Sequence, residues 1–116
     1  MTEEEVLQKT NRINLLFDFY QQLLTEKQQM FLKHYFHDDY SLGEIASEFQ
    51  ISRQAVYEHI KRAESVLDDY EAKLRLLAKH EERQELLGQL ERIGTELPQG
   101  SRTSFRAITD RLSELD

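Results

Sequence analysis

Residues 41–62 constrain what this chain can fold into more than any other stretch of its sequence. Ser41 and Glu44 have the spacing of a capping box, which predicts a short helix that begins at Leu42. Ser52, a few residues further along the chain, can cap a second helix. The segment between the two helices is too short for anything other than a tight turn, so the pattern predicts a helix-turn-helix motif.

The apolar residues of this motif indicate its inner face, where periodic apolar positions pack against the rest of the domain. We expect burial of Ile45, Ala46 and Phe49 in the first helix, Ile51 in the turn, and Val56 and Ile60 in the second helix. The opposite face of the second helix presents Arg53, Gln54, Tyr57, Glu58, Lys61 and Arg62. Such an outward polar set is typical of a recognition helix, whose first turns enter the major groove of DNA.

The outward residues are the candidate nucleic-acid-binding site. Arg pairs with guanine and Gln with adenine in the major groove, so we expect base or backbone contacts from Arg53, Gln54 and Tyr57. Phosphate contacts are expected from Lys61 and Arg62, and Ser41 and Ser52 are further candidates of the same kind. A solvated helix face, or a helix-turn-helix that binds protein, explains the same residues, and this alternative stays open.

The distribution of charge limits where nucleic acid can bind. The chain has 15 Lys and Arg residues against 22 Asp and Glu residues, a formal net charge of -7. This balance disfavours nucleic acid, because duplex affinity comes mostly from cations that neutralise phosphates. Residues 51–62, with three bases and one acid, are the only segment with net positive charge. We therefore expect DNA to contact one small face, with help from a homodimer or another partner.

Composition predicts an all-α, cytoplasmic protein. Only four glycines and one proline occur in 116 residues, and strong helix formers are abundant. No apolar run approaches the roughly 20 residues of a membrane span, and no cysteine is present for disulfides or thiolate zinc sites. The first residues, Met-Thr-Glu-Glu-Glu, lack the basic and apolar regions of a secretory signal, so neither export nor a membrane partner is expected.

Apolar spacing beyond the motif predicts a long recognition helix. Spacings of four and three alternate along a seam formed by Val56, Ile60, Ala63, Leu67, Tyr70, Leu74 and Leu77. This seam is either core or the interface of a homodimer. Ahead of the motif, we expect one helix over 2–22 and another that begins at Glu26 and carries Phe31, Leu32 and Tyr35 into the core.

The same spacing predicts two parts of the chain. The helix-turn-helix domain, with its N-terminal helix and extended recognition helix, is expected over residues 1–78, and a helical extension over 79–116. The polar stretch 79–85 lacks Gly and Pro, which favours a continuous or gently bent helix there over a hairpin. Pro98 and Gly100 predict a break at 98–101, followed by a short amphipathic helix.

No pattern of catalytic or cofactor-binding residues is present. The sequence has no glycine-rich phosphate loop and no nucleophile beside a plausible base. His34, His37, Asp38 and Asp39 form the one group that could be drawn as a metal cluster, but a helix end followed by a solvated acidic turn explains them equally. We expect no enzyme activity, no cofactor and no metal.

Residues from Leu24 to Leu74 resemble region 4 of bacterial sigma factors, the module that reads the upstream promoter element. The resemblance is carried by Leu24-Thr25, Phe31-Leu32, Tyr35, Glu44-Ile45-Ala46, Ile51-Ser52-Arg53, Val56, Ile60 and Arg62-Ala63. Gln50 stands where a turn glycine is usual, which implies a positive φ at a non-glycine residue. The acidic Glu58 also departs from the family's reading face, and the polymerase-binding region is missing, so the chain is not a sigma factor.

The chain resembles the YlxM-type family of small helix-turn-helix proteins still more closely, over residues 11 to about 93. The matching motifs are residues 14–20, 23–25, 40–46 and 51–57. The resemblance implies a bacterial protein whose gene commonly neighbours those of the signal recognition particle, with a regulatory role proposed in that pathway. Two functions follow as expectations: a DNA-binding regulator, or a non-catalytic module that binds protein or RNA of the signal recognition particle.

Overall fold

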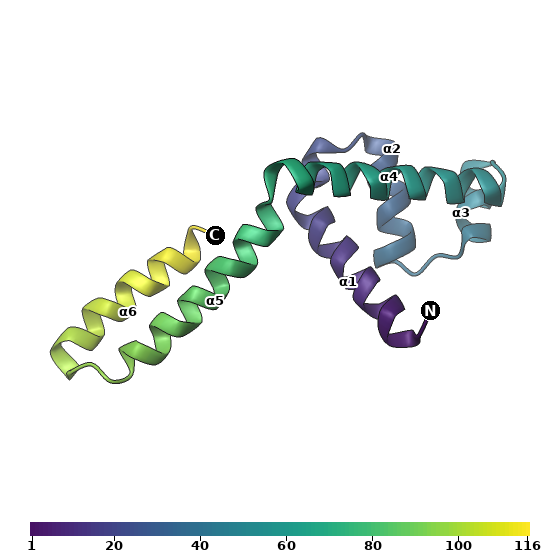
Figure 1. The fold of residues 1–116 in the computed structure, drawn as a ribbon. Helices are drawn as coiled ribbons and strands as arrows, with labels where there is room; N and C mark the ends of the chain where they lie inside the picture. The colour runs from purple at the N-terminus through teal and green to yellow at the C-terminus, as the bar shows by residue number, and fades with distance from the viewer. The chain divides into compact units, whose positions relative to one another are not determined.

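The computed structural model describes residues 1–116, and they form helices without any strand, which confirms the all-α class. The chain divides into two compact units, Met1–Arg75 and Leu76–Asp116. The first unit contains α1 (Glu3–Tyr20), α2 (Glu26–Leu32), α3 (Leu42–Phe49) and α4 (Arg53–Leu74), and the second contains α5 (Leu76–Gly94) and α6 (Gln99–Glu114) (Figure 1). The helix-turn-helix motif predicted from residues 41–62 is confirmed as α3, a short turn and α4.

Side-chain caps fix where the helices of the first unit begin. The predicted box at Ser41 is present: the Glu44 N–H donates to Ser41 Oγ, and the Ser41 N–H donates to the Glu44 carboxylate. Thr25 and Gln28 form the same reciprocal pair ahead of α2. Each box satisfies N–H groups that have no partner inside the helix, which is why these short helices begin at defined residues.

The core of the first unit surrounds α4, which packs against α1, α2 and α3. Val56, Ile60, Ala63 and Leu67 of the predicted seam are buried here within a single chain, so this half of the seam is core. Tyr20 on α1 closes one end of the core, where its hydroxyl donates a 2.6 Å hydrogen bond to Glu71 on α4. A buried carboxylate is tolerable there because a partner offsets its lost hydration.

A wide helical turn after α2 changes which aromatic residue is buried. Residues Lys33–His37 form the π-helix η2, which has more residues per turn than an α-helix. Tyr35, which the α-helical period places in the core, is 37% exposed, whereas Phe36 is 9% exposed. The predicted burial of Tyr35 is therefore wrong. The wider π-turn moves the buried position one residue along the chain, to Phe36.

The predicted continuous rod through Leu77 is wrong, because α4 ends at Leu74. Arg75 adopts a left-handed conformation with φ 55°, and its N–H donates to the Glu71 carbonyl at 2.8 Å. This is the usual way to cap a helix C-terminus, but with Arg in the place that glycine usually takes. The division between the units falls at this residue, three residues before the boundary expected from the sequence. Leu74 is 45% exposed, and Leu77 is buried in α5 of the second unit.

The second unit is an antiparallel hairpin of α5 and α6 (Figure 1). The prediction of an unbroken helix across residues 79–85 is confirmed, since α5 spans them. The break expected at 98–101 instead lies at 95–98, because Gln99 already begins α6. Arg102 stabilises this turn by donating to the carbonyl oxygens of Thr95 and Leu97, which lie beyond the end of α5.

Candidate nucleic-acid interface

The turn between α3 and α4 fixes the orientation of the motif. Gln50 ends α3 in a left-handed conformation with φ 55°, which confirms the positive φ expected at this non-glycine position. The Ile51 N–H then donates to the Ala46 carbonyl at 3.1 Å, and Ser52 Oγ accepts from the Ala55 N–H at 3.0 Å. The turn thus satisfies the end of α3 and the start of α4 with its own groups.

The outer face of α4 carries the residues predicted to contact nucleic acid. Arg53, Gln54, Tyr57, Glu58 and Arg62 are exposed, and Lys61 is half-buried. Gln54 Nε2 donates to the Glu58 carboxylate at 3.4 Å, a long bond that is easily replaced. Most of the predicted reading face is therefore accessible on one helix.

The two serines of the candidate site act as helix caps. The hydroxyl oxygens of Ser41 and Ser52 accept the N–H groups that cap α3 and α4. Both residues are exposed at helix N-termini, where a phosphate is favoured by the free N–H groups and the helix dipole. The structure brings Ser41 to the same side of the motif as Arg53, since the two residues line one hollow of about 510 Å³, and Ser52 directly precedes Arg53 in the chain.

Gly43 is a residue of this surface that the sequence reading missed. A Cβ atom at this position would lie 2.9 Å from Nη2 of Arg53, so the guanidinium group lies directly against the glycine backbone. A Cβ atom here would make the flexible Arg53 side chain shift, so the glycine permits this particular placement of the guanidinium group. A glycine inside the short helix α3, where it costs helix propensity, is the signal that could have identified it.

The cations of the candidate site differ in how they are paired. Lys61 Nζ lies 3.5 Å from the Glu64 carboxylate and 5.4 Å from the Tyr57 ring centroid, and the same carboxylate lies 3.7 Å from Lys9 Nζ. Arg53 and Arg62 make no ion pair. Arg62 Nε donates only a long 3.5 Å hydrogen bond to the Glu58 carbonyl, so the two arginines can neutralise a ligand without first breaking an ion pair.

His59 lies on the inner side of α4, stacked on Phe31 with ring centroids 4.9 Å apart. Burial lowers its pKa below the ordinary value of 6.5, and the nearby Lys27 and Arg62 lower it further. The imidazole is therefore neutral at pH 7, and it adds no positive charge to the reading face.

The histidines and aspartates before the motif do not converge on a common point. His34 stacks on Tyr40 and approaches Asp38 with Nδ1 at 3.3 Å, while His37 packs against the Phe17 ring. No group of three His, Cys, Asp or Glu side chains is arranged to hold a metal ion.

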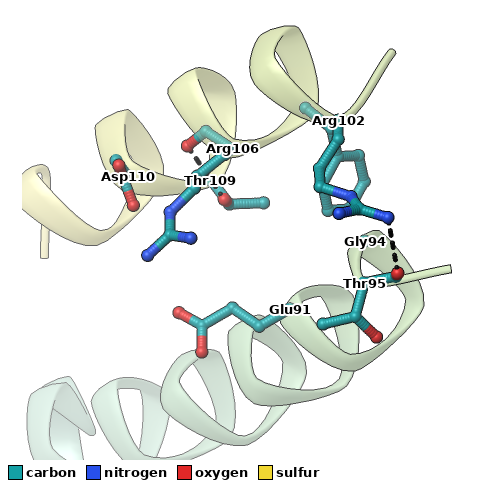
Figure 2. Close-up of a pocket in the computed structure, with 8 residues that line it drawn as sticks. Glu91, Gly94, Thr95, Arg102, Arg106, Thr109 and Asp110 are labelled. Carbon is teal, nitrogen blue, oxygen red and sulfur yellow. Dashed lines mark hydrogen bonds between the residues drawn. The ribbon is translucent and has the colours of Figure 1, made fainter. Parts of the chain in front are cut away.

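A hollow of about 280 Å³ in the second unit lies between α5 and α6 (Figure 2). It is lined by charges of both signs, with Glu91 and Asp110 against Arg102 and Arg106. Arg102 is already engaged with the carbonyl groups of the turn. The hollow thus offers no excess charge of one sign, and the net positive segment of the chain lies on α4 instead.

The fold and this surface define the class: the chain is an all-α helix-turn-helix protein with an exposed second motif helix. Residues 7–103 match the family described as "Putative helix-turn-helix protein, YlxM / p13 like". The chain belongs to this family, which confirms the resemblance seen in its motifs.

Relatives in several bacteria share about half or more of the aligned residues. The YlxM protein of Bacillus subtilis is 50% identical over 112 residues, which cover 95% of this chain and 98% of the relative. A family member in Halalkalibacterium halodurans is 62% identical over 85 residues, covering 73% and 78% of the two chains. One in Listeria monocytogenes serotype 4b is 58% identical over 86 residues, covering 74% and 78%. None of the helices is long and apolar enough to cross a membrane.

Proposed function

We propose that this protein is a non-catalytic, cytoplasmic regulator that binds DNA through α3 and α4. The observation that carries the proposal is the exposed start of α4. Arg53, Gln54 and Tyr57 project there, and the Arg53 guanidinium group makes no ion pair. The segment 51–62 also has net positive charge, with three bases against one acid. A helix of this kind fits the major groove with its N-terminal turns against the bases.

Each side chain has a distinct role in this proposal. Arg53 pairs with guanine and Gln54 with adenine, once Gln54 exchanges its long bond to Glu58 for a base edge. Arg62 and Lys61, further along α4, contact phosphates, and the helix N-termini at Ser41 and Ser52 do the same. Base contacts specify the sequence, whereas phosphate contacts position the protein on the duplex.

We further propose that the DNA-binding form is a homodimer. The first unit has nine Lys and Arg residues against fourteen Asp and Glu residues, a formal charge of -5. One small cationic face on an acidic unit binds DNA weakly, because most of the surface repels phosphate. Two linked copies make the second contact intramolecular and raise the overall affinity.

The test is fluorescence anisotropy of the full chain with duplex DNA from upstream of its own operon and with a scrambled duplex, across a salt series. Arg53→Ala should lose about tenfold or more in affinity for the cognate duplex, the loss of one good bidentate base contact. Arg62→Ala should weaken both duplexes alike and reduce the salt slope by about one. Arg12→Ala, on the exposed part of α1, is the charge-matched control and should bind as the parent does.

Equal affinity of the Arg53→Ala variant and the parent for the cognate duplex would contradict the proposal. So would a parent protein that binds neither duplex at low salt, where phosphate contacts are strongest.

A second candidate function is binding to protein or RNA of the signal recognition particle, and the acidity of the first unit favours a basic protein component. Glu58 on the exposed face of α4 repels phosphate but suits a basic protein surface. The same titration with signal recognition particle RNA and with its protein component separates the two functions. Tighter binding to either component than to the cognate duplex would replace the DNA proposal with this one.

A further inference from the structure

Six large apolar side chains of the second unit are exposed: Leu76, at the start of α5, is 37% exposed, and the other five are more so. Leu86 and Ile93 on α5, and Ile108, Leu112 and Leu115 on α6, are between 45% and 74% exposed. Scattered single apolar residues are ordinary on protein surfaces, but a contiguous group indicates an interface. Whether these five form one group depends on which side of the hairpin each helix presents them.

Helix geometry places all five on the same side. In the part of α5 that lies alongside α6, Leu87 and Gly94 are buried, and Thr109 is the buried residue of α6, so these positions face the partner helix. Residues one position earlier lie 100° around the helix, and these are Leu86, Ile93 and Ile108. The helices α5 and α6 are antiparallel (Figure 1). The same rotation on each helix therefore turns both stripes toward one face of the hairpin. We name this surface, formed by Leu86, Ile93, Ile108, Leu112 and Leu115, the apolar face.

Few residues of the second unit are buried, namely Leu77, Leu87 and Gly94 on α5 and Thr109 on α6. Gly94 lies against Phe105, where a Cβ atom would come within 2.6 Å of the ring, and Thr109 is the buried position of α6. Folded units of about 40 residues usually need disulfides, a metal or oligomerisation. The chain has no cysteine, and no group of side chains is arranged for a metal ion. Oligomerisation remains as the way to complete this core.

We propose that the apolar face binds the apolar face of a second copy, so that two hairpins form a four-helix bundle. Charge favours a second copy as the occupant. The second unit has six bases and eight acids, a formal charge of -2, so two copies repel each other less there than at the first unit, with -5. Within the hairpin, α5 has a formal charge of -1 and α6 of +1, so a two-fold axis along the helices sets oppositely charged helices against each other.

The inference does not depend on DNA binding, and its test contains no DNA. Sedimentation equilibrium of the full chain over a wide concentration range should give twice the 13.8 kDa chain mass. Ile93→Glu and Ile108→Glu should each give the monomer mass at the same concentrations, because a carboxylate cannot enter an apolar seam. Leu7→Glu, at a 60% exposed leucine of α1 outside the apolar face, is the matched control and should remain a dimer.

A milder variant separates loss of pairing from loss of folding. Ile108→Ala with Leu112→Ala should raise the dimer dissociation constant by tenfold or more while far-UV circular dichroism at high concentration stays that of the parent. A parent protein that is monomeric at all concentrations would overturn the proposal. A dimer that Ile93→Glu and Ile108→Glu leave intact, or that Leu7→Glu disrupts equally, would overturn it as well.

Discussion

The two units of the chain are both built from amphipathic helices but bury their apolar residues to very different degrees. In the first unit, Leu16, Tyr20, Ile45, Val56 and Leu67 are fully or almost fully buried, because three elements surround α4. In the second unit, α5 and α6 have only each other, and most of their leucine and isoleucine side chains remain exposed or half-exposed. Amphipathic helices thus yield a core only when enough neighbours cover the apolar stripe.

The largest expected effect comes from truncating one leucine in the core of the first unit. Leu67→Ala should destabilise the protein by about 2–5 kcal/mol, because Leu67 is fully buried and its removal leaves a cavity. Leu7→Ala, at an exposed position of α1, should change stability by about 0.5 kcal/mol or less. Urea unfolding followed by circular dichroism measures both. Equal effects of the two substitutions would show that the first unit lacks the tight core described.

A pair of glycines in α5 tests how closely the helices of the second unit approach. Gly94→Ala should destabilise the hairpin by about 1–3 kcal/mol, because the new Cβ would clash with the Phe105 ring. Gly88→Ala should stabilise it by up to about 1 kcal/mol, since its Cβ would meet only the end of Arg92 at 4.0 Å. Thermal unfolding at one fixed concentration compares them. If both variants were stabilised, the close approach at Gly94 would be wrong.

Gly43 tests the link between packing and binding in the first unit. Gly43→Ala should improve helix propensity in α3 and yet lower affinity for the cognate duplex several-fold, because the new methyl group displaces the Arg53 guanidinium. Gly100→Ala, with nothing within 4 Å of its Cβ, is the control and should leave DNA affinity unchanged. Anisotropy titrations together with melting curves distinguish displacement of Arg53 from unfolding. Undiminished affinity of the Gly43→Ala variant would refute this positioning role.

Acid should weaken the two units over different pH ranges. The pKa of His59 is lowered in the folded protein by burial, so the unfolded chain takes up the proton first, and stability falls as pH drops below about 6.5. In the second unit, the hydrogen bond from Gln84 and the one from Arg83 lower the pKa of Asp116. The contribution of Asp116 to stability is therefore present above about pH 3.8, the ordinary pKa, and is lost as the pH falls through the lower pKa of the folded state.

Stability measured between pH 7 and pH 3 should therefore show two separable steps. His59→Leu should remove the step near neutrality and Asp116→Asn the acidic one, without either affecting the other. A single step that both substitutions alter equally would contradict the separation.

The sequence predicted most of what depends on short-range chemistry. The capping box at Ser41 and the cap at Ser52 follow from residues within a few positions of each other, and both are confirmed. The left-handed Gln50, which the resemblance to sigma region 4 implied, is confirmed as well. The burial of Val56, Ile60 and Ala63 followed from helical period alone. The partners and binding roles proposed for α4 stay predictions.

The sequence did not predict two departures from α-helical backbone conformation, because no characteristic residue accompanies them. The π-turn at Lys33–His37 and the left-handed Arg75 involve no glycine or proline, so nothing local indicates them. In each case tertiary packing outweighs the ordinary α-helical preference, which costs little to override at a single residue. The approach of Arg53 to Gly43 joins two helices, and spacing along one helix cannot reveal it.

The interleaving of residues along α4 has a consequence for how such proteins diversify. Buried positions 56, 60, 63 and 67 alternate with exposed positions 53, 54, 57, 58 and 62 on the same few turns. Substitutions at the exposed set touch no core contact, so they can accumulate without a cost in folding. The two sets of positions in α4 can therefore evolve almost independently: the fold constrains the buried set, and the exposed set is free to change with the binding target.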